Sequence, residues 1–290
     1  MDPLRVTARR GSVVEAVHRV HAVAVEDGRV VDSAGNPGLV SFFRSSAKPI
    51  QALPLARERD DVPEDELAIA CASHHAESAQ LAAAARLLAR APATEGDLEL
   101  GLQEGRPPTR LAHNCSGKHA GFLAVCRARG WPLEGYRLAS HPLQQALLGE
   151  VTAAAELPTA EIPSAVDGCG VVTFALTLER MAHAFTRIER MPGGAKVAAA
   201  MRAHPALIGY EGATDTELMR QRPGWIAKGG AEGLLCAASP EGRGVALKVE
   251  DGNQRALRPA LASFLGLDPA FADVPVTNSR GEIVGEVLAE

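Results

Sequence analysis

The 290-residue sequence predicts an α+β fold, in which an antiparallel sheet formed by the N- and C-terminal strands is covered by central helices. Two observations predict this class. Apolar and polar residues alternate around hairpin turns near both ends of the chain, and amphipathic stretches of helical period lie between them. Because no fixed repeat or long linker interrupts the chain, we expect a single domain over residues 1–290.

Three hairpins are predicted in the terminal segments. Near the N-terminus, residues 20–25 alternate in polarity and Asp27-Gly28 follows, a pair that favours a tight hairpin turn. Near the C-terminus, the first predicted hairpin pairs residues 234–238 with 245–249. The second pairs residues 274–277 with 282–288 and turns at residues 278–281.

Six amphipathic stretches in the middle of the chain predict helices. They cover residues 64–72, 77–90, 118–129, 141–157, 171–187 and 194–203. Between the second and third of these, residues 90–108 contain Pro92, Pro107 and Pro108. Because proline interrupts regular structure, this segment is the predicted surface excursion.

The composition excludes several classes of function. Hydrophobic residues make up 46% of the chain, so we expect a large hydrophobic core. The net charge is −5, so the chain has no excess of positive charge with which to bind nucleic acid. No apolar run approaches the roughly 18 residues of a membrane-spanning helix, and early charged residues argue against a secretory signal. The five cysteines are widely spread, which predicts reduced thiols. We therefore expect a cytoplasmic protein with a small-molecule substrate.

A candidate Ser-Lys pair occurs where residues 44–49 lead into a helix. Ser45 and Lys48 are three residues apart, which puts their side chains on one helix face about one turn apart. A serine becomes a nucleophile when a base removes its proton, and lysine can be that base once burial or nearby positive charge lowers its pKa from about 10.4. The alternative is that Ser45 caps the helix and Lys48 is solvated.

Three further segments concentrate reactive side chains. In residues 71–77, Ser73 is either a reactive hydroxyl or a helix cap. In residues 113–121, a thiol, an amine and an imidazole fall within one turn and could bind a metal ion, whereas the glycine-rich lead-in of an ATP-binding loop is missing. In residues 166–170, Cys169 lies between two glycines, either as a ligand or as an inert residue of a tight turn.

Lysine occurs in two more segments of interest near the C-terminus. Lys228 opens a Lys-Gly-Gly stretch, and Lys248 interrupts the apolar strand predicted at residues 245–249. Alternation leaves open whether Lys248 faces water or a buried site, although lysine is rarely buried.

In this order, the segments resemble the asparaginase II family of the Rhizobium etli type. The resembling stretches run from about residue 42 to 256 and include FFRSSAKPIQALPL, HNCSGKHAGFL, VDGCGVVTFAL and GVALKVEDGNQRA. The resemblance implies a zinc-containing L-asparaginase, which hydrolyses L-asparagine to L-aspartate and ammonia. It also implies a fold like that of serine β-lactamases and glutaminases, and a homodimer.

For catalysis, the resemblance implies two Ser-Lys pairs, Ser45 with Lys48 and Ser73 with Lys248. In the mechanism we expect, neutral Lys48 takes the proton of Ser45, and Ser45 attacks the carboxamide carbon. Ser73 and Lys248 then carry the proton to the departing ammonia, and water hydrolyses the acyl-enzyme. One alternative is a Ser-Lys hydrolase of glutamine, a β-lactam or an ester, and another is a non-catalytic zinc or thiol sensor.

The resemblance also implies a metal site and substrate contacts. Zinc would be bound by Cys115, Lys118 and Cys169, although the residues alone favour His119 over a lysine ligand. The candidates for substrate contacts are Arg44, Asn114, His119 and Asp167. Among these, Arg44 suits the carboxylate of an amino acid and Asp167 its ammonium group.

Overall fold

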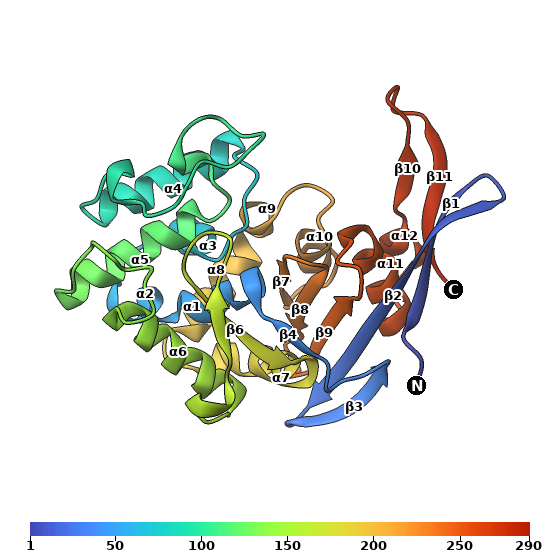
Figure 1. Ribbon diagram of the computed structural model, residues 1–290, viewed down its shortest axis with the longest axis horizontal. Helices are drawn as coiled ribbons and strands as arrows, with labels where there is room; N and C mark the ends of the chain where they lie inside the picture. Colours follow the sequence, from blue (N-terminus) through green and yellow to red (C-terminus); the bar gives the residue numbers. More distant parts are fainter.

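The main sheet combines strands from both ends of the chain, as predicted (Figure 1). The computed structural model describes residues 1–290. The eight strands are β1 (Leu4–Arg10), β2 (Val13–Glu26), β3 (Arg29–Ala34), β7 (Ile226–Gly230), β8 (Leu234–Ala238), β9 (Gly244–Val249), β10 (Pro275–Thr277) and β11 (Ile283–Ala289). They run in the order β10-β11-β1-β2-β9-β8-β7, with β3 paired to β2, and all pairs are antiparallel.

All three predicted hairpins are confirmed. The first joins β2 to β3 through Asp27 and Gly28, whose φ angles of 48° and 74° are the left-handed values that a two-residue hairpin turn requires. The others are β8-β9 and β10-β11. The N-terminal hairpin β1-β2 and the edge strand β7 are additional to the prediction.

Helices from the middle of the chain gather beside the sheet (Figure 1). They are α1 (Lys48–Gln51), α2 (Leu53–Glu58), α3 (Glu64–Ala70), α4 (Ser78–Arg90), α5 (Ser116–Arg129), α6 (Pro142–Ala155), α7 (Leu178–Arg187), α8 (Gly194–Ala203), α9 (Pro205–Ile208) and α10 (Thr214–Gln221). Two more, α11 (Leu257–Leu265) and α12 (Pro269–Ala272), follow β9. Five of the six predicted helices are confirmed, with boundaries that shift by at most two residues. No helix is both long and apolar enough to span a bilayer.

The prediction of one helix over residues 171–187 is wrong in its first part. Residues Val172–Thr177 form strand β6, which pairs with β4 (Val40–Phe42) and β5 (Ser164–Val166) in a second, three-stranded sheet. The segment is rich in β-branched and aromatic residues and its first five residues are buried, which favours a strand between two partners. The helical period begins only at α7, where the Thr177 side chain accepts a hydrogen bond from the Arg180 backbone and caps the helix.

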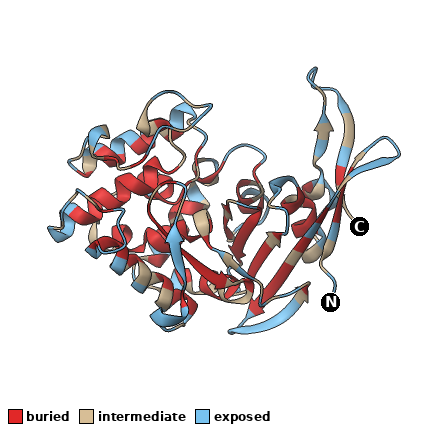
Figure 2. Cartoon of the chain, in the orientation of Figure 1, coloured by how far each residue is buried: buried red, intermediate tan, exposed pale blue.

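The main sheet is covered on both faces near its centre. Strand β9 is buried at successive positions, which requires packing on both sides, and both α7 and α11 contact it. Gly244 of β9 lies so close to α7 that a Cβ there would be 2.2 Å from the Ala182 carbonyl oxygen. Figure 2 shows buried residues concentrated where helices meet the sheet, while most of β3 is exposed.

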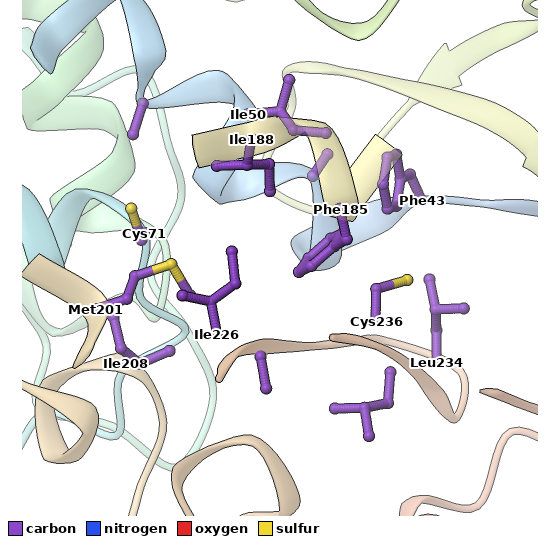
Figure 3. Close-up of a cluster of buried hydrophobic side chains, with 14 of the residues drawn as sticks. Phe43, Ile50, Cys71, Phe185, Ile188, Met201, Ile208, Ile226, Leu234 and Cys236 are labelled. Carbon is purple, nitrogen blue, oxygen red and sulfur yellow. The ribbon is translucent and has the colours of Figure 1, made fainter. Parts of the chain in front are cut away.

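Side chains of this core anchor the segments that carry the predicted reactive residues (Figure 3). Phe43 and Ile50 are fully buried on either side of the 3-10 turn η1 (Arg44–Ala47) and the start of α1. Cys71 anchors the segment after α3, and Ile226 anchors the start of β7. Each anchor lies two residues from a polar group described below, so the core fixes the polar groups through the backbone.

Candidate active site

A cavity of about 400 Å³ lies between the helices and the edge strand β7. On the helical side it is lined by Ser45 from η1, Ser73 after α3 and Asn114 before α5. On the sheet side it is lined by residues 228–231, and its outer part by residues of α11 and the segment before it. The volume falls in the range of small-molecule sites.

Lys48 forms its Ser-Lys contact with Ser73 rather than Ser45. Its amine lies 3.0 Å from Ser73 Oγ and also donates to the backbone carbonyls of Ala72 and Asn114. The side chain is fully buried, and burial lowers the pKa of Lys48 to about 8, with nearby positive charges contributing. The amine is therefore close to the neutral form at which lysine acts as a base.

Ser45 lies at the cavity without a hydrogen-bond partner for its hydroxyl. The direct Ser45–Lys48 hydrogen bond expected from the sequence is not formed. The two residues nevertheless lie on a continuous helical segment, η1 into α1, three residues and thus about one turn apart. Both predicted serines thus line one cavity, and Lys48 is bonded to the second of them.

Lys228 of β7 is a polar group of the cavity that the sequence pointed to without assigning it a role. It is 1% exposed, and its amine lies 3.3 Å from Asp215 Oδ2 and 2.8 Å from the Gly229 carbonyl. Its own carbonyl accepts from the hydroxyl of buried Ser46, which ties β7 to η1. The glycines after it are required by this close approach, since a Cβ on Gly230 would lie 2.9 Å from Ser46 Oγ.

The predicted pairing of Ser73 with Lys248 is wrong. Lys248 lies on β9, which is separated from the edge strand β7 by β8, and it does not line the cavity. Its amine instead donates to the backbone carbonyls of Glu232 and Val249. Lys248 is therefore partly exposed and bonded beside the turn between β7 and β8, away from the reactive serines.

Of the four predicted substrate contacts, only Asn114 lines the cavity, and its side-chain amide has no partner in the protein. Arg44 and Asp167 are bonded to each other, with Arg44 Nε 2.6 Å from Asp167 Oδ1. His119 is fully buried and its Nδ1 contacts the Tyr136 hydroxyl at 2.6 Å. Arg44, Asp167 and His119 do not line the cavity. Their contacts with substrate stay predictions.

The three predicted zinc ligands converge from the start of α5 and the turn between β5 and β6. Lys118 Nζ lies 3.2 Å from Cys169 Sγ, and the thiol of Cys169 neighbours that of Cys115. This contact, reinforced by the amines of Lys48 and Lys118, lowers the pKa of Cys115 despite its burial. Burial by itself would lower the pKa of Lys118, but the thiols and Asp167 raise it overall.

The side chains of Cys115, Lys118 and Cys169 form a donor set that suits zinc, although lysine is not one of the common zinc ligands. No group of three or more His, Cys, Asp and Glu side chains lies together at metal-binding spacing. Two thiols and an amine nevertheless meet in a buried pocket, and Nε2 of neighbouring His119 is buried without a hydrogen-bond partner. Two thiolates and a nitrogen donor are a combination that zinc accepts.

Comparisons with known proteins give a family and distant structural similarity. A family model described as L-asparaginase II matches residues 6–289. No curated protein sequence matches the chain. Among solved structures, a candidate β-lactamase from Bacteroides dorei shows 12% identity and a TM-score of 0.45, covering 85% of this chain and 93% of that one. A β-lactamase from Mycobacterium bovis shows 14% identity and a TM-score of 0.37, with 87% and 92% covered.

Proposed function

Since the chain belongs to the L-asparaginase II family, we propose that it is an amidohydrolase that converts L-asparagine and water to L-aspartate and ammonia. One observation supports this proposal above the others. A fully buried lysine with a lowered pKa is bonded to one serine of the cavity and lies about one turn from a second. Such an arrangement supplies a nucleophile, a base and a proton carrier in one small-molecule site.

In the proposed mechanism, Ser45 is the nucleophile and Lys48 is its base. A neutral amine has two N–H groups and one lone pair. The carbonyls of Ala72 and Asn114 accept the two N–H groups, which leaves the lone pair for a serine hydroxyl. Lys48 takes the proton from Ser45 as the hydroxyl oxygen attacks the carboxamide carbon, and Ser73 passes a proton from Lys48 to the departing nitrogen. Water then hydrolyses the ester on Ser45.

Lys228 replaces Lys248 as the second lysine of the proposed site. Its amine is buried at the cavity, and its positive charge is one of the neighbours that lower the pKa of Lys48. A fixed positive charge in a buried site also stabilises the negative charge that develops on the carboxamide oxygen during attack. Asp215 holds the Lys228 amine in place.

We further propose that Cys115, Lys118 and Cys169 hold a zinc ion. When bound, zinc would supply a cross-link between the start of α5 and the turn before β6, as structural zinc sites do. This cross-link would also help to position the Lys48 amine, because the backbone carbonyl of Asn114, which precedes Cys115, accepts a hydrogen bond from that amine. The Lys118 amine has to lose its proton to act as a ligand. A homodimer and a cytoplasmic location stay predictions.

The rate of amide hydrolysis is expected to rise with pH and to level off above about pH 8. Burial lowers the pKa of Lys48 to about 8, and only the neutral amine accepts the proton of Ser45. Below this pKa, kcat/KM should therefore fall roughly tenfold for each pH unit. The measurement is kcat/KM from pH 6 to 9.5. Melting temperatures measured at each pH distinguish protonation of the Lys48 amine from unfolding of the protein. A flat profile between pH 6 and 9 would contradict the assignment of Lys48.

The proposed function is tested by ammonia release from L-asparagine and L-glutamine and by ring opening of nitrocefin, each with the same purified protein. Ammonia from L-asparagine with little ring opening is the expected result. One methylene changes affinity by only about 1 to 3 kcal/mol, so some activity on glutamine is compatible with the proposal. Elemental analysis of the same sample should find one zinc ion per chain. Ring opening without ammonia release would replace the proposal by a β-lactam hydrolase.

A further inference from the structure

The motif at residues 71–77 contains two histidines to which the proposed mechanism gives no role. His74 directly follows Ser73 and is fully buried, whereas His75 lines the cavity. Burial lowers the pKa of His74 to about 3, and the positive charge of Lys48 contributes. The imidazole of His74 is therefore neutral near neutral pH, with one N–H group and one acceptor nitrogen.

Both nitrogens of His74 have a partner, and the partners determine which nitrogen carries the proton. Nδ1 accepts from the backbone N–H of Ala76 at 3.1 Å, so the proton lies on Nε2. Nε2 lies 2.8 Å from the hydroxyl oxygen of Ser116, and that hydroxyl donates to the Leu111 carbonyl at 2.8 Å. The Ser116 hydroxyl therefore accepts from His74, and both buried side chains have their hydrogen-bonding groups satisfied.

The hydrogen bond between His74 and Ser116 joins the two segments that hold the Lys48 amine. One segment, at residues 72–73, supplies a backbone carbonyl and the serine hydroxyl, and the other supplies the Asn114 carbonyl. His74 follows the first segment directly, and Ser116 comes two residues after Asn114. The two segments are therefore connected on one side by the Lys48 amine and on the other by the His74–Ser116 bond.

The turn after Ser73 adopts a conformation that side chains have to stabilise. Ala76 has a φ of 62°, a left-handed value that is unfavourable for residues other than glycine. Its backbone N–H is the group that donates to His74 Nδ1. The side-chain oxygen of Gln80 accepts from the backbone N–H groups of the residues on either side of Ala76. The imidazole of His74 thus contributes to holding this turn as well as to its connection with α5.

Close backbone packing holds the helices together independently of His74. Helices α3 and α5 pack against each other, and a Cβ on Gly117 of α5 would lie 2.2 Å from the Ile69 carbonyl oxygen of α3. Only glycine permits so close an approach. Loss of the His74 imidazole is therefore expected to shift the turn after Ser73 without separating the two helices.

From these contacts we infer that His74 is a positioning residue for the proposed amide hydrolysis. It holds the Ser73 hydroxyl against the Lys48 amine by joining the turn after Ser73 to the start of α5. The inference rests on the proposed function, in which Ser73 carries a proton from Lys48 to the departing nitrogen. His74 does not line the cavity, so it acts through Ser73 and not on the substrate.

His74→Leu is expected to lower kcat for ammonia release from L-asparagine by roughly 10 to 10²-fold and to leave KM within about threefold. A displacement of about 1 Å in a reacting group has an effect of this size on rate, whereas the lining of the cavity is unchanged. His74→Gln keeps an N–H group that can reach the Ser116 hydroxyl and should recover most of the loss. The measurements are kcat and KM at pH 8.5, with the melting temperature of each variant.

His141→Leu is the matched control. His141 is also buried, and its Nδ1 accepts from the backbone N–H of Leu143 at 3.1 Å while its Nε2 lies 3.0 Å from the Pro132 carbonyl. It lies outside the segments that hold Lys48, so its loss should lower the melting temperature and leave kcat within about twofold. A fall in kcat that is no greater for His74→Leu than for His141→Leu overturns the inference.

Ser116→Ala removes the same hydrogen bond from the other side and tests the inference even where His74→Leu does not fold. It should also lower kcat with little change in KM. The double variant His74→Leu with Ser116→Ala should lose little more than His74→Leu alone, because the two side chains form one contact. Losses that multiply in the double variant, or an unchanged kcat for Ser116→Ala, overturn the inference and leave the proposed function intact. Absence of ammonia release by the unmodified protein overturns the proposed function and the inference with it.

Discussion

Ser45→Ala is expected to lower kcat for amide hydrolysis by at least about 10⁴-fold, because the change removes the proposed nucleophile. The substitution should cost little stability, since the Ser45 hydroxyl makes no hydrogen bond in the protein and its backbone is held by the buried neighbours Phe43 and Ile50. Ser73→Ala should lower kcat less, by roughly 10² to 10⁴-fold, as expected for loss of a proton carrier. The measurement is ammonia release under saturating substrate.

Two readouts separate the roles of the two serines. Acid quenching during turnover, followed by peptide mass spectrometry, should find the acyl group on Ser45 and not on Ser73. Ser33→Ala is the matched control, because Ser33 of β3 lies outside the cavity and its hydroxyl makes no hydrogen bond. If Ser73→Ala abolishes turnover while Ser45→Ala retains it, the nucleophile is Ser73, which is already bonded to Lys48.

The overall arrangement could be predicted from the sequence because it depends on local patterns. Hairpin turns such as Asp27-Gly28 and the helical period of five central stretches specify the elements without reference to the rest of the chain. The failure at β6 has the same origin. Residues 171–177 are apolar without a clear period, and a short apolar run fits a buried strand as well as a buried helix until its partners β4 and β5 are known.

The reactive residues could be identified from the sequence more easily than the contacts between them. Ser45, Ser73 and Asn114 line one cavity, and buried Lys48 is bonded to Ser73. Which lysine contacts which serine depends on tertiary distances that no local pattern contains. The same holds for Arg44, which suited a substrate carboxylate by its chemistry but is bonded across 123 residues to Asp167.

Arg255 and Arg258 were assigned no role from the sequence, although Arg255 is part of the last resembling motif and Arg258 follows it by two residues. Both line the outer part of the cavity because the 3-10 turn η6 (Gln254–Ala256) and α11 pack beside the main sheet, which is a property of the whole fold.

Lys228→Met is expected to lower kcat/KM by roughly 10² to 10³-fold, whereas Lys248→Met should leave it within about twofold. The two lysines lie on strands of the same sheet, but only Lys228 lines the cavity. Loss of its positive charge removes stabilisation of the developing oxyanion. It also removes one of the charges that lower the pKa of Lys48, so the acidic limb of the pH profile should move to higher pH in the variant.

Lys228→Met leaves the buried carboxylate of Asp215 without its ion-pair partner, which by itself destabilises the fold. The double variant Lys228→Met with Asp215→Asn removes that charge and should restore the melting temperature without restoring activity. Lys228→Arg keeps the charge and should keep the acidic limb near that of the unmodified protein. If the double variant instead regains full turnover, Lys228 acts only through stability, and the second lysine of the mechanism must be sought elsewhere. Equal losses for Lys228→Met and Lys248→Met would also contradict the assignment, because the Lys248 amine is bonded only to backbone carbonyls outside the cavity.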